Sequence, residues 1–363
     1  MERAFPDIET VEAAVLGHFR LVHGPGWRIT VPTTAMRRTW SAMYFLQMEN
    51  DKQTRRQVVK IHCFDHQPEA STSWESEQLR RRCKAEHDSY AAIASHLSGH
   101  DREEAAFIRT ECYLPEINAF VTDYCRMTTF HSLCFKRLRW VSGTLSGQNA
   151  RWARKAGVLL SCLHDMTAAS LNRELKIASA QDHLHESLIA VETLTRLCGK
   201  FPATETYEKA ISLLRGTEYS QRVPVHSDFN LSNVAFTHDG RPLILDASLD
   251  LMDSPYFDVA TFTVHALTMN IRLLSLGLLP PRQLISGMVE NFLQGYAQGR
   301  PCDQSMIWYF EGHILLRRWA QTLESVALGS FDLHGLRNPE LTRFLADSLY
   351  RNLLRDWERR RPT

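Results

Sequence analysis

The chain has 363 residues, of which 44% are hydrophobic and 23% are charged, a composition typical of a folded globular protein. This content of apolar residues excludes wholesale disorder, and the length suits two ordinary domains. The 42 Lys and Arg residues nearly balance the 41 Asp and Glu residues, which gives a net charge of +1. The chain is therefore not a general binder of polyanions.

Cysteine spacing and apolar stretches also limit the class of protein. The eight cysteines include no C-x-x-C pair, which argues against a zinc ribbon or a thioredoxin-type site and favours thiols in a reducing compartment. The first residues, MERAFPDIETVEAAV, lack the apolar core of a signal peptide. The longest apolar stretch, 264–279, is interrupted by His265, Asn270 and Arg272, so it is too short and polar to span a membrane. We therefore expect a cytoplasmic protein without a transmembrane segment.

The first 125 residues are predicted to form a small antiparallel sheet with helices. Asp7 is a candidate N-cap, because apolar residues recur at helical spacing from Ile8 to Phe19. A second helix is indicated by the spacing of Ala85, Ser89 and Leu97. Strand-like patterns occur at 27–31, 42–48, 57–63, 107–114 and 118–124.

From about residue 126 the pattern becomes mostly helical. Apolar stripes at helical spacing predict helices near 152–166, 184–198, 284–292, 306–326 and 341–357. A short β segment at 223–245 interrupts them. We therefore predict an α+β fold with two domains, a sheet-containing one over 1–125 and a larger, mostly helical one over 126–363 with an embedded hairpin.

The embedded hairpin carries the residues with the clearest chemistry. A strand at 233–236, an Asp-Gly turn at 239–240 and a return strand at 242–245 are typical of a β-hairpin. Its open end would bring together Asp228, Asn233 and Asp246. Two carboxylates and an amide oxygen make a hard-oxygen site that suits Mg²⁺, with Asn233 and Asp246 as the natural ligand pair. Asp228 would remain to orient an attacking hydroxyl or to accept its proton.

These residues also match a known motif. His226, Asp228 and Asn233 follow the H-x-D-x-x-x-x-N pattern of kinase catalytic loops. Together with the hairpin, Asp246 and the string DSPYFDVA at 253–260, they resemble the aminoglycoside phosphotransferase and choline kinase superfamily, which has a two-lobed protein-kinase-like fold. The specific resemblance is confined to 225–260, and the rest of the chain agrees with it in the order of elements.

The resemblance implies a nucleotide site in the N-terminal lobe and a catalytic, substrate-binding C-terminal lobe. Lys60, within an apolar strand, would contact the phosphates of ATP, unless it is a plain edge-strand lysine. Glu86 would pair with Lys60, and Glu75 and Glu77 are the alternatives. The backbone of a hinge at 122–125 would hold the adenine, which assigns nucleotide contacts to Asp123, Tyr124 and Cys125. ATP and Mg²⁺ are the implied cofactors.

Structural roles are expected for four other residues. His226 is interpreted as a residue that braces the catalytic loop, and Asp258 as an acceptor for backbone amides of that loop. His164 and Asp165 are interpreted as a capping and packing feature at the end of a helix.

The sequence departs from the family pattern in three places. After Asp246 it has Ala247 and Ser248 rather than an aromatic residue, which changes the packing and leaves the carboxylate in place. No glycine lies between Gly26 and Gly99, so the expected phosphate-covering loop at 33–41 lacks the glycines of protein kinases. Arg37 and Arg38 would either contact phosphate in their place or be solvated. Ser227 stands where the family has glycine, and we expect the effect to be mild because serine is small.

The distribution of charged residues indicates which class of acceptor molecule the protein would bind. Residues 124–164 include no Asp or Glu and seven basic residues, which are Arg126, Lys136, Arg137, Arg139, Arg151, Arg154 and Lys155. Residues 259–300 contain one acid, Glu290, and three arginines, Arg272, Arg282 and Arg300. A neutral or anionic acceptor, such as a sugar, a sugar phosphate or an envelope glycan precursor, is complementary to such a region. The alternative is a solvated basic face.

We therefore predict an enzyme that moves the γ-phosphate of ATP to a hydroxyl of a small molecule with the help of Mg²⁺. The alternatives are an aminoglycoside or choline/ethanolamine-type kinase and a non-catalytic, kinase-like nucleotide-binding protein. A protein kinase is disfavoured because no A-P-E segment follows Asp246. Nucleic-acid binding is not expected, because the net charge is near zero and no such motif is present.

Overall fold

The computed structural model describes residues 5–37, 41–62, 76–99, 105–135, 147–198, 210–212, 214–215, 219, 221–300, 302–329, 331 and 338–362. Contacts divide the chain into two units. The first comprises Met1–Met127 with Asp246–Leu249, and the second comprises Thr128–Leu245 with Asp250–Thr363. Among the described residues, no helix is both long and apolar enough to cross a membrane.

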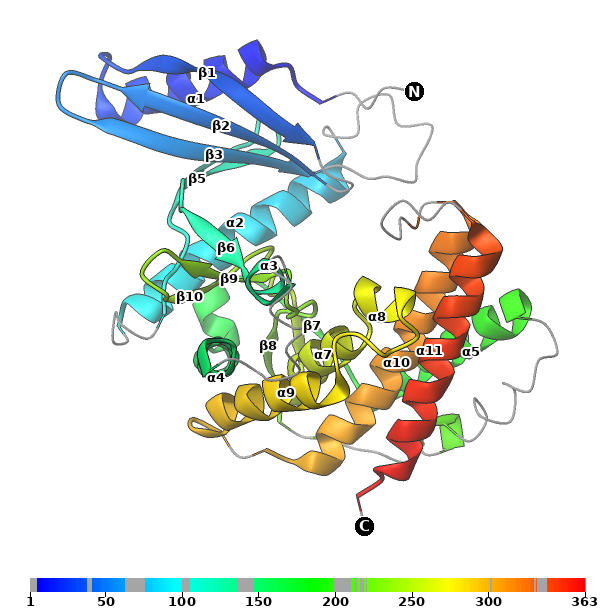
Figure 1. Cartoon of the computed structure of the whole chain (residues 1–363). Coiled ribbons are helices and arrows are strands. Elements are labelled where there is room, and N and C mark those ends of the chain that lie inside the picture. The colour runs from blue at the N-terminus through cyan, green and yellow to red at the C-terminus, as the bar shows by residue number, and fades with distance from the viewer. Residues whose placement is uncertain are drawn as a thin grey trace. The chain divides into compact units, whose positions relative to one another are not determined.

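The first unit is built on a five-stranded antiparallel sheet with the order β1-β2-β3-β5-β4 (Figure 1). Its strands are β1 (Arg28–Arg37), β2 (Ser41–Glu49), β3 (Thr54–His62), β4 (Thr110–Leu114) and β5 (Ala119–Asp123). The five predicted strands are confirmed, although the first is longer and the fourth shorter than expected.

The predicted phosphate-covering loop at 33–41 is wrong in extent. Residues 33–37 belong to β1 and pair with β2 from Thr34↔Phe45 to Arg37↔Ala42. The β-branched residues of this stretch suit a strand, which explains the longer pairing. Arg37 is exposed and its guanidinium lies 5.3 Å from the ring centre of Phe5, while Arg38 lies outside the described residues.

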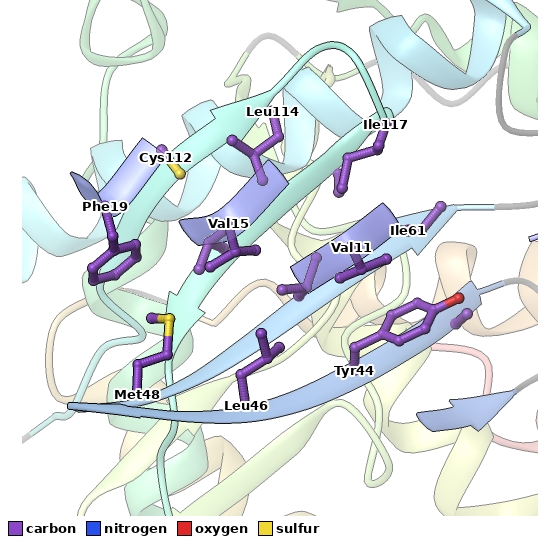
Figure 2. Packing of buried hydrophobic residues seen from close by; sticks show 14 of the residues in the cluster. Val11, Val15, Phe19, Tyr44, Leu46, Met48, Ile61, Cys112, Leu114 and Ile117 are labelled. Atoms are coloured by element: carbon purple, nitrogen blue, oxygen red, sulfur yellow. The ribbon is translucent and has the colours of Figure 1, made fainter. Parts of the chain in front are cut away.

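Helix α1 (Ile8–His23) and helix α2 (Glu77–Ser98) belong to this unit. The Asp7 side chain caps α1 by accepting from the amide of Thr10 at 2.7 Å, as predicted. Val11, Val15 and Phe19 of α1 point at the sheet and form its main apolar core (Figure 2). The residues that they meet come from four strands and a turn: Tyr44, Leu46, Met48, Val59, Ile61, Cys112, Leu114, Ile117 and Val121.

The alternation of β3 determines where Lys60 lies. Val59 and Ile61 are in the core that α1 covers. Successive side chains of a strand point to opposite faces, so Lys60 projects from the other face, where its ammonium meets Glu86 of α2. The sheet therefore separates an apolar face from a face that carries charge.

The second unit is mostly helical. Its helices are α3 (Phe130–Phe135), α4 (Gly147–His164), the 3₁₀ helix η3 (Ala168–Leu171), α5 (Ala180–Cys198), α7 (Pro255–Leu267), α8 (Asn270–Leu274), α9 (Arg282–Ala297), α10 (Gln304–Ala327) and α11 (Pro339–Arg359). Two glycines allow α4 and α9 to touch through their backbones. A methyl group at Gly157 would overlap the carbonyl oxygen of Phe292, and one at Gly295 would overlap that of Arg154.

Two small sheets lie among these helices. One has the order β10-β9-β6 and contains β6 (Met127–Thr129), β9 (Val234–Thr237) and β10 (Pro242–Ile244); the other has the order β7-β11-β8 and contains β7 (Lys176–Ile177), β8 (Val223–Val225) and β11 (Leu251–Asp253). The predicted hairpin is confirmed, because β9 and β10 pair antiparallel from Pro242↔Phe236 to Ile244↔Val234. Gly240, at φ 79°, supplies the left-handed residue of its turn.

Candidate active site

Lys60 of β3 is held between two carboxylates of the first unit. Its ammonium donates to Glu86 Oε1 at 2.7 Å and also to Asp246 Oδ1. The second oxygen of Glu86 lies 2.6 Å from His62 Nε2. The Lys60 and Glu86 side chains are almost buried, with 13% and 4% exposed, whereas 51% of the Asp246 side chain is exposed.

Of the alternative partners for Lys60, Glu77 does not reach it. Glu77 lies in the first turn of α2, where it is exposed and pairs with Arg81 at 3.1 Å. Glu75 lies outside the described residues. His62 was missed by the sequence analysis, although it follows Lys60 by two residues and therefore lies on the same face of β3.

The electrostatics keep this group ionised. Burial alone would lower the pKa of Lys60, but the neighbouring Glu86 and Asp246 outweigh it and raise that pKa. Burial would raise the pKa of Glu86, but Lys60 and His62 outweigh it and lower that pKa to about 2. A buried ammonium and a buried carboxylate thus each depend on the other.

Helix α2 also holds the segment 246–249. Tyr90 Oη accepts from the amide of Asp246 at 2.8 Å, and Ser89 Oγ donates to the carbonyl of Ser248. Asp246 has φ 54°, a left-handed conformation that aspartate tolerates better than most residues. Tyr90 lies one turn after Glu86, so a single helix positions both the partner of Lys60 and the backbone of Asp246.

In the second unit, Asp258 organises the loop that precedes β9. Its carboxylate is fully buried and accepts from the amides of His226 at 2.7 Å and of Ser227 at 2.9 Å. His164 Nε2 lies 3.1 Å from the same carboxylate. The His226 ring lies 2.8 Å from the carbonyl of Leu245, the residue before Asp246. His226 therefore links the loop to the end of the return strand.

His164 does more than cap or pack against a helix. Its other nitrogen lies 3.0 Å from Tyr296 Oη, so the ring connects α9 with Asp258. Burial lowers the pKa of His164 although Asp258 opposes this effect. Asp165, by contrast, pairs with Arg300 at 2.7 Å, so the two neighbours have separate roles.

Two amides orient the exposed carboxylate of Asp228. Asn230 Nδ2 donates to its Oδ1 at 2.7 Å, and Asn233 Nδ2 donates to its Oδ2 at 2.8 Å. Asn233 Nδ2 also donates to the Asp228 carbonyl at 3.0 Å. Asn230 was missed by the sequence analysis; its Oδ1 accepts from the amide of Ser232 at 2.8 Å, an Asx turn that Asn favours.

The hinge residues follow β5 directly. The amide of Asp123 donates to the Arg109 carbonyl and that of Tyr124 to the Arg56 carbonyl, each at 2.9 Å. The Asp123 side chain accepts from Gln57 Nε2 at 3.0 Å. Both amides are thus engaged within the first unit. Cys125, the next residue, is half-buried.

The basic residues of 124–164 and 259–300 differ in exposure and in their partners. Arg151 and Arg154 are exposed on α4, and Lys155 donates to the Gly240 carbonyl at 2.6 Å. Lys136, Arg137 and Arg139 lie outside the described residues. Arg272 is buried and lines a cavity of about 510 Å³ among α7 to α11, whose lining includes no residue of 225–260.

The comparisons with known proteins place this geometry in a fold. No protein-family model and no curated protein gives a significant match to the sequence. Among solved structures, a macrolide 2'-phosphotransferase from Brachybacterium faecium is similar at 13% identity with a TM-score of 0.53, over 92% of this chain and 97% of that one. A choline kinase from Streptococcus pneumoniae is 12% identical with a TM-score of 0.51, over 93% and 98%. A glucosamine kinase in complex with glucosamine, ADP and phosphate is 14% identical with a TM-score of 0.56, over 96% and 87%.

These similarities extend over nearly the whole chain. The chain therefore has the kinase-like fold of these small-molecule phosphotransferases, and the predicted α+β class is confirmed. At this level of identity the fold is what is shared.

The backbone conformation of Ser227 adds a consequence that its small size does not reveal. Ser227 has φ 61°, in the left-handed region where a residue with a Cβ is strained by about 1–2 kcal/mol. The two backbone hydrogen bonds to Asp258 hold the strained loop in place. The important property of glycine at this position is its backbone freedom rather than its small size.

We predict that Ser227→Gly stabilises the folded protein by about 0.5–1 kcal/mol, because relief of strain exceeds the added entropy of the unfolded chain. The denaturation midpoint in urea measures the change. Ser232→Gly is the matched control, since Ser232 lies in the same loop outside the left-handed region, and it should give no gain. Equal midpoints for Ser227→Gly and the wild type would contradict the assigned strain.

We predict that Glu86 makes the first unit sensitive to acid. Its lowered pKa means that its carboxylate stabilises the fold above the unfolded-state pKa of about 4.3 and that this contribution is lost as the pH falls toward 2. Between about pH 5 and pH 3 the melting temperature should fall more steeply in the wild type than in Glu86→Gln. Glu77→Gln, which removes an exposed carboxylate of the same helix, should keep the wild-type slope. Parallel slopes for Glu86→Gln and the wild type would show that the carboxylate does not gain from Lys60.

Proposed function

We propose that the chain is a small-molecule kinase that transfers the γ-phosphate of ATP to a hydroxyl group with Mg²⁺ as cofactor. The observation that carries this proposal is the contact of Lys60 with both Glu86 and Asp246. A lysine that pairs with a buried glutamate and also with a half-exposed aspartate is suited to contact the phosphates of a nucleotide, while the aspartate is suited to bind the accompanying Mg²⁺. The fold shared with a choline kinase and with a glucosamine kinase in complex with ADP supports the proposal.

In this proposal Lys60 contacts the nucleotide phosphates while Glu86 holds it in place. Glu86 is too deeply buried to exchange partners easily, so it is suited to fixing the position of the ammonium. Asp246 is the exposed member of the group and is the one that a ligand would draw away from Lys60. Backbone groups of 123–125 would hold the adenine.

The residues also suit Mg²⁺, which prefers oxygen donors. Asp246 has an exposed carboxylate. Asn233 turns its Nδ2 toward Asp228, and its Oδ1 accepts no hydrogen bond from the described residues. We propose that Asp246 and Asn233 hold the ion, which would neutralise phosphate charge when bound.

Asp228 is proposed as the catalytic residue. Its carboxylate is exposed, and the amides of Asn230 and Asn233 fix its direction. A carboxylate presented in this way can orient the acceptor hydroxyl and take its proton as the new bond to phosphorus forms. Asp258 and His226 act through the loop and are positioning residues.

We predict that Asp228→Asn lowers phosphate transfer by about 10²–10⁴-fold, the usual contribution of a positioned acid or base. Nucleotide affinity should stay within about threefold, a change below 0.7 kcal/mol, because the proposed phosphate contacts come from Lys60. Transfer is measured with radiolabelled ATP across a panel of sugars, amino alcohols and aminoglycosides, and affinity by calorimetry with a non-hydrolysable ATP analogue.

Two further variants make that experiment specific. Asp246→Asn should weaken Mg²⁺-dependent nucleotide binding, unlike Asp228→Asn. Asp239→Asn, in the hairpin turn, is the control and should behave as the wild type in both assays. Transfer by Asp228→Asn within tenfold of the wild type would refute the catalytic role. Nucleotide binding by the wild type without transfer to any acceptor would favour a non-catalytic nucleotide-binding protein.

We propose further that the acceptor is a neutral or anionic hydroxyl compound such as a sugar or a sugar phosphate. The absence of acids from 124–164 supports this class. An ATP-dependent role is consistent with a cytoplasmic protein. So are six cysteines that form no disulfide, which are Cys83, Cys112, Cys125, Cys134, Cys162 and Cys302.

We predict a higher kcat/KM for sugars or sugar phosphates than for kanamycin-type aminoglycosides and for choline or ethanolamine. Cationic acceptors would have to approach a region that lacks compensating carboxylates. Steady-state kinetics on the three groups of compounds decides the question. A value of about 10⁴ M⁻¹s⁻¹ or more on an aminoglycoside would contradict the predicted acceptor class while leaving the kinase proposal intact.

A further inference from the structure

A cluster of metal-ligating side chains lies in the second unit, between α5 and α10. His183 and Glu186 are one helical turn apart on α5, so they project from the same side of that helix. His313 comes from α10, which packs along α5. None of these residues has a part in the proposed kinase chemistry. His183 and His313 are buried, with 3% and 0% of their surface exposed.

Two of the three distances within the cluster are close to those between ligands of one ion. His183 Nδ1 lies 3.2 Å from His313 Nε2, and His313 Nε2 lies 3.6 Å from Glu186 Oε2. The three ligand atoms all lie within 4.8 Å of one another. A tetrahedral ion with nitrogen and oxygen ligands at about 2.0–2.2 Å requires ligand separations of about 3.3–3.6 Å.

Neighbouring side chains engage the other nitrogen of each ring. His313 Nδ1 lies 2.8 Å from Ser187 Oγ. His183 Nε2 lies 2.8 Å from Asp253 Oδ2, and Asp253 Oδ1 accepts from Tyr219 Oη at 2.6 Å. A carboxylate or hydroxyl behind a histidine is the usual outer contact of a metal ligand, because it fixes the ring and the tautomer. His183 Nδ1 and His313 Nε2 are thereby left facing each other.

Several buried atoms of the cluster lack a well-directed hydrogen bond. They are His183 Nε2, Asp253 Oδ2 and Glu186 Oε2. The first two are within ion-pair distance of each other, and Arg317 Nη1 lies 3.1 Å from Glu186 Oε2, but none of these contacts is aligned. Buried polar atoms usually have partners. Of the three, Glu186 Oε2 is the one near His313 Nε2, so it is the atom whose missing partner an ion between the rings would supply.

A proton chain is the alternative to an ion. Ser187, His313, His183 and Asp253 could share protons in sequence with both rings neutral, which would account for the 3.2 Å separation of the rings. It would leave Glu186 Oε2 without a hydrogen bond. The carboxylates of Glu186 and Asp253 together carry two negative charges and Arg317 offsets one of them, so a cation between the rings is electrostatically compatible.

We propose that His183, Glu186 and His313 form a site for one zinc-type divalent cation, with water as the fourth ligand. Two imidazoles and one carboxylate are donors that suit Zn²⁺ better than Mg²⁺ or Ca²⁺. Glu186 is the half-exposed member, with 41% of its side chain accessible, and gives the ion a route to solvent. The ion joins α5 to α10 and, through His183, contacts Asp253 at the end of β11.

The test uses the full chain, stripped with a chelator and dialysed against Zn²⁺ or Co²⁺. We expect about one equivalent of bound Zn²⁺ by elemental analysis and, with Co²⁺, the visible absorption bands of a tetrahedral site. Glu186→Gln should lower Zn²⁺ affinity at least tenfold, and His313→Gln should abolish binding. Glu192→Gln and His185→Gln change exposed residues of the same helix and should bind as the wild type does.

Two results would overturn the proposal. One is a wild-type protein that keeps no ion after loading and dialysis, in which case the proton chain accounts for the cluster. The other is equal affinity in Glu186→Gln and Glu192→Gln, which would place any bound zinc elsewhere, for example on a cysteine. Because Glu186 is half-exposed, its variant decides the matter even if His313→Gln fails to fold.

Discussion

The ion-paired ammonium of Lys60 is the constraint on which the arrangement of the first unit depends. A lysine on the inner part of a sheet is costly unless carboxylates compensate for its lost hydration. Glu86 provides the buried partner and ties α2 to β3. Asp246 provides the exposed one, and α2 holds its backbone through Tyr90. A short segment from late in the chain is thus part of the unit built by the first 127 residues.

The sequence predicted what depends on local patterns. Helix α1 with its cap, the strands of the sheet and the hairpin at 234–244 follow from apolar periodicity, an N-cap and an Asp-Gly turn. The choice of Glu86 as the neighbour of Lys60 rested on a family resemblance, and the structure brings the two together. What the sequence could not supply was long-range contact. His62, Tyr90 and Asn230 gain their importance only from neighbours that folding brings to them.

Backbone conformation was the second feature that the sequence did not predict. The strand pairing that extends β1 to Arg37 depends on its register with β2, which a single strand does not reveal. The left-handed backbone of Ser227 is likewise held by long-range contacts, because the amides of His226 and Ser227 both donate to Asp258. A serine in place of glycine is a small change of side-chain volume. Its energetic cost comes from the positive φ, which a residue with a Cβ adopts less easily than glycine.

Asp253 at the end of β11 and Asp258 in the first turn of α7 connect the two regions of the second unit that carry chemistry. Asp258 accepts hydrogen bonds from two backbone amides of the loop that contains Asp228, and it also contacts His164. Asp253, five residues earlier, receives Tyr219 and lies against His183. Both carboxylates are fully buried. Their hydrogen-bond partners in the protein replace the water that they have lost, so neither carboxylate can move without losing stabilisation. The backbone from 253 to 258 therefore has little freedom, and an ion bound beside His183 would stiffen the same short stretch on which the Asp228 loop rests.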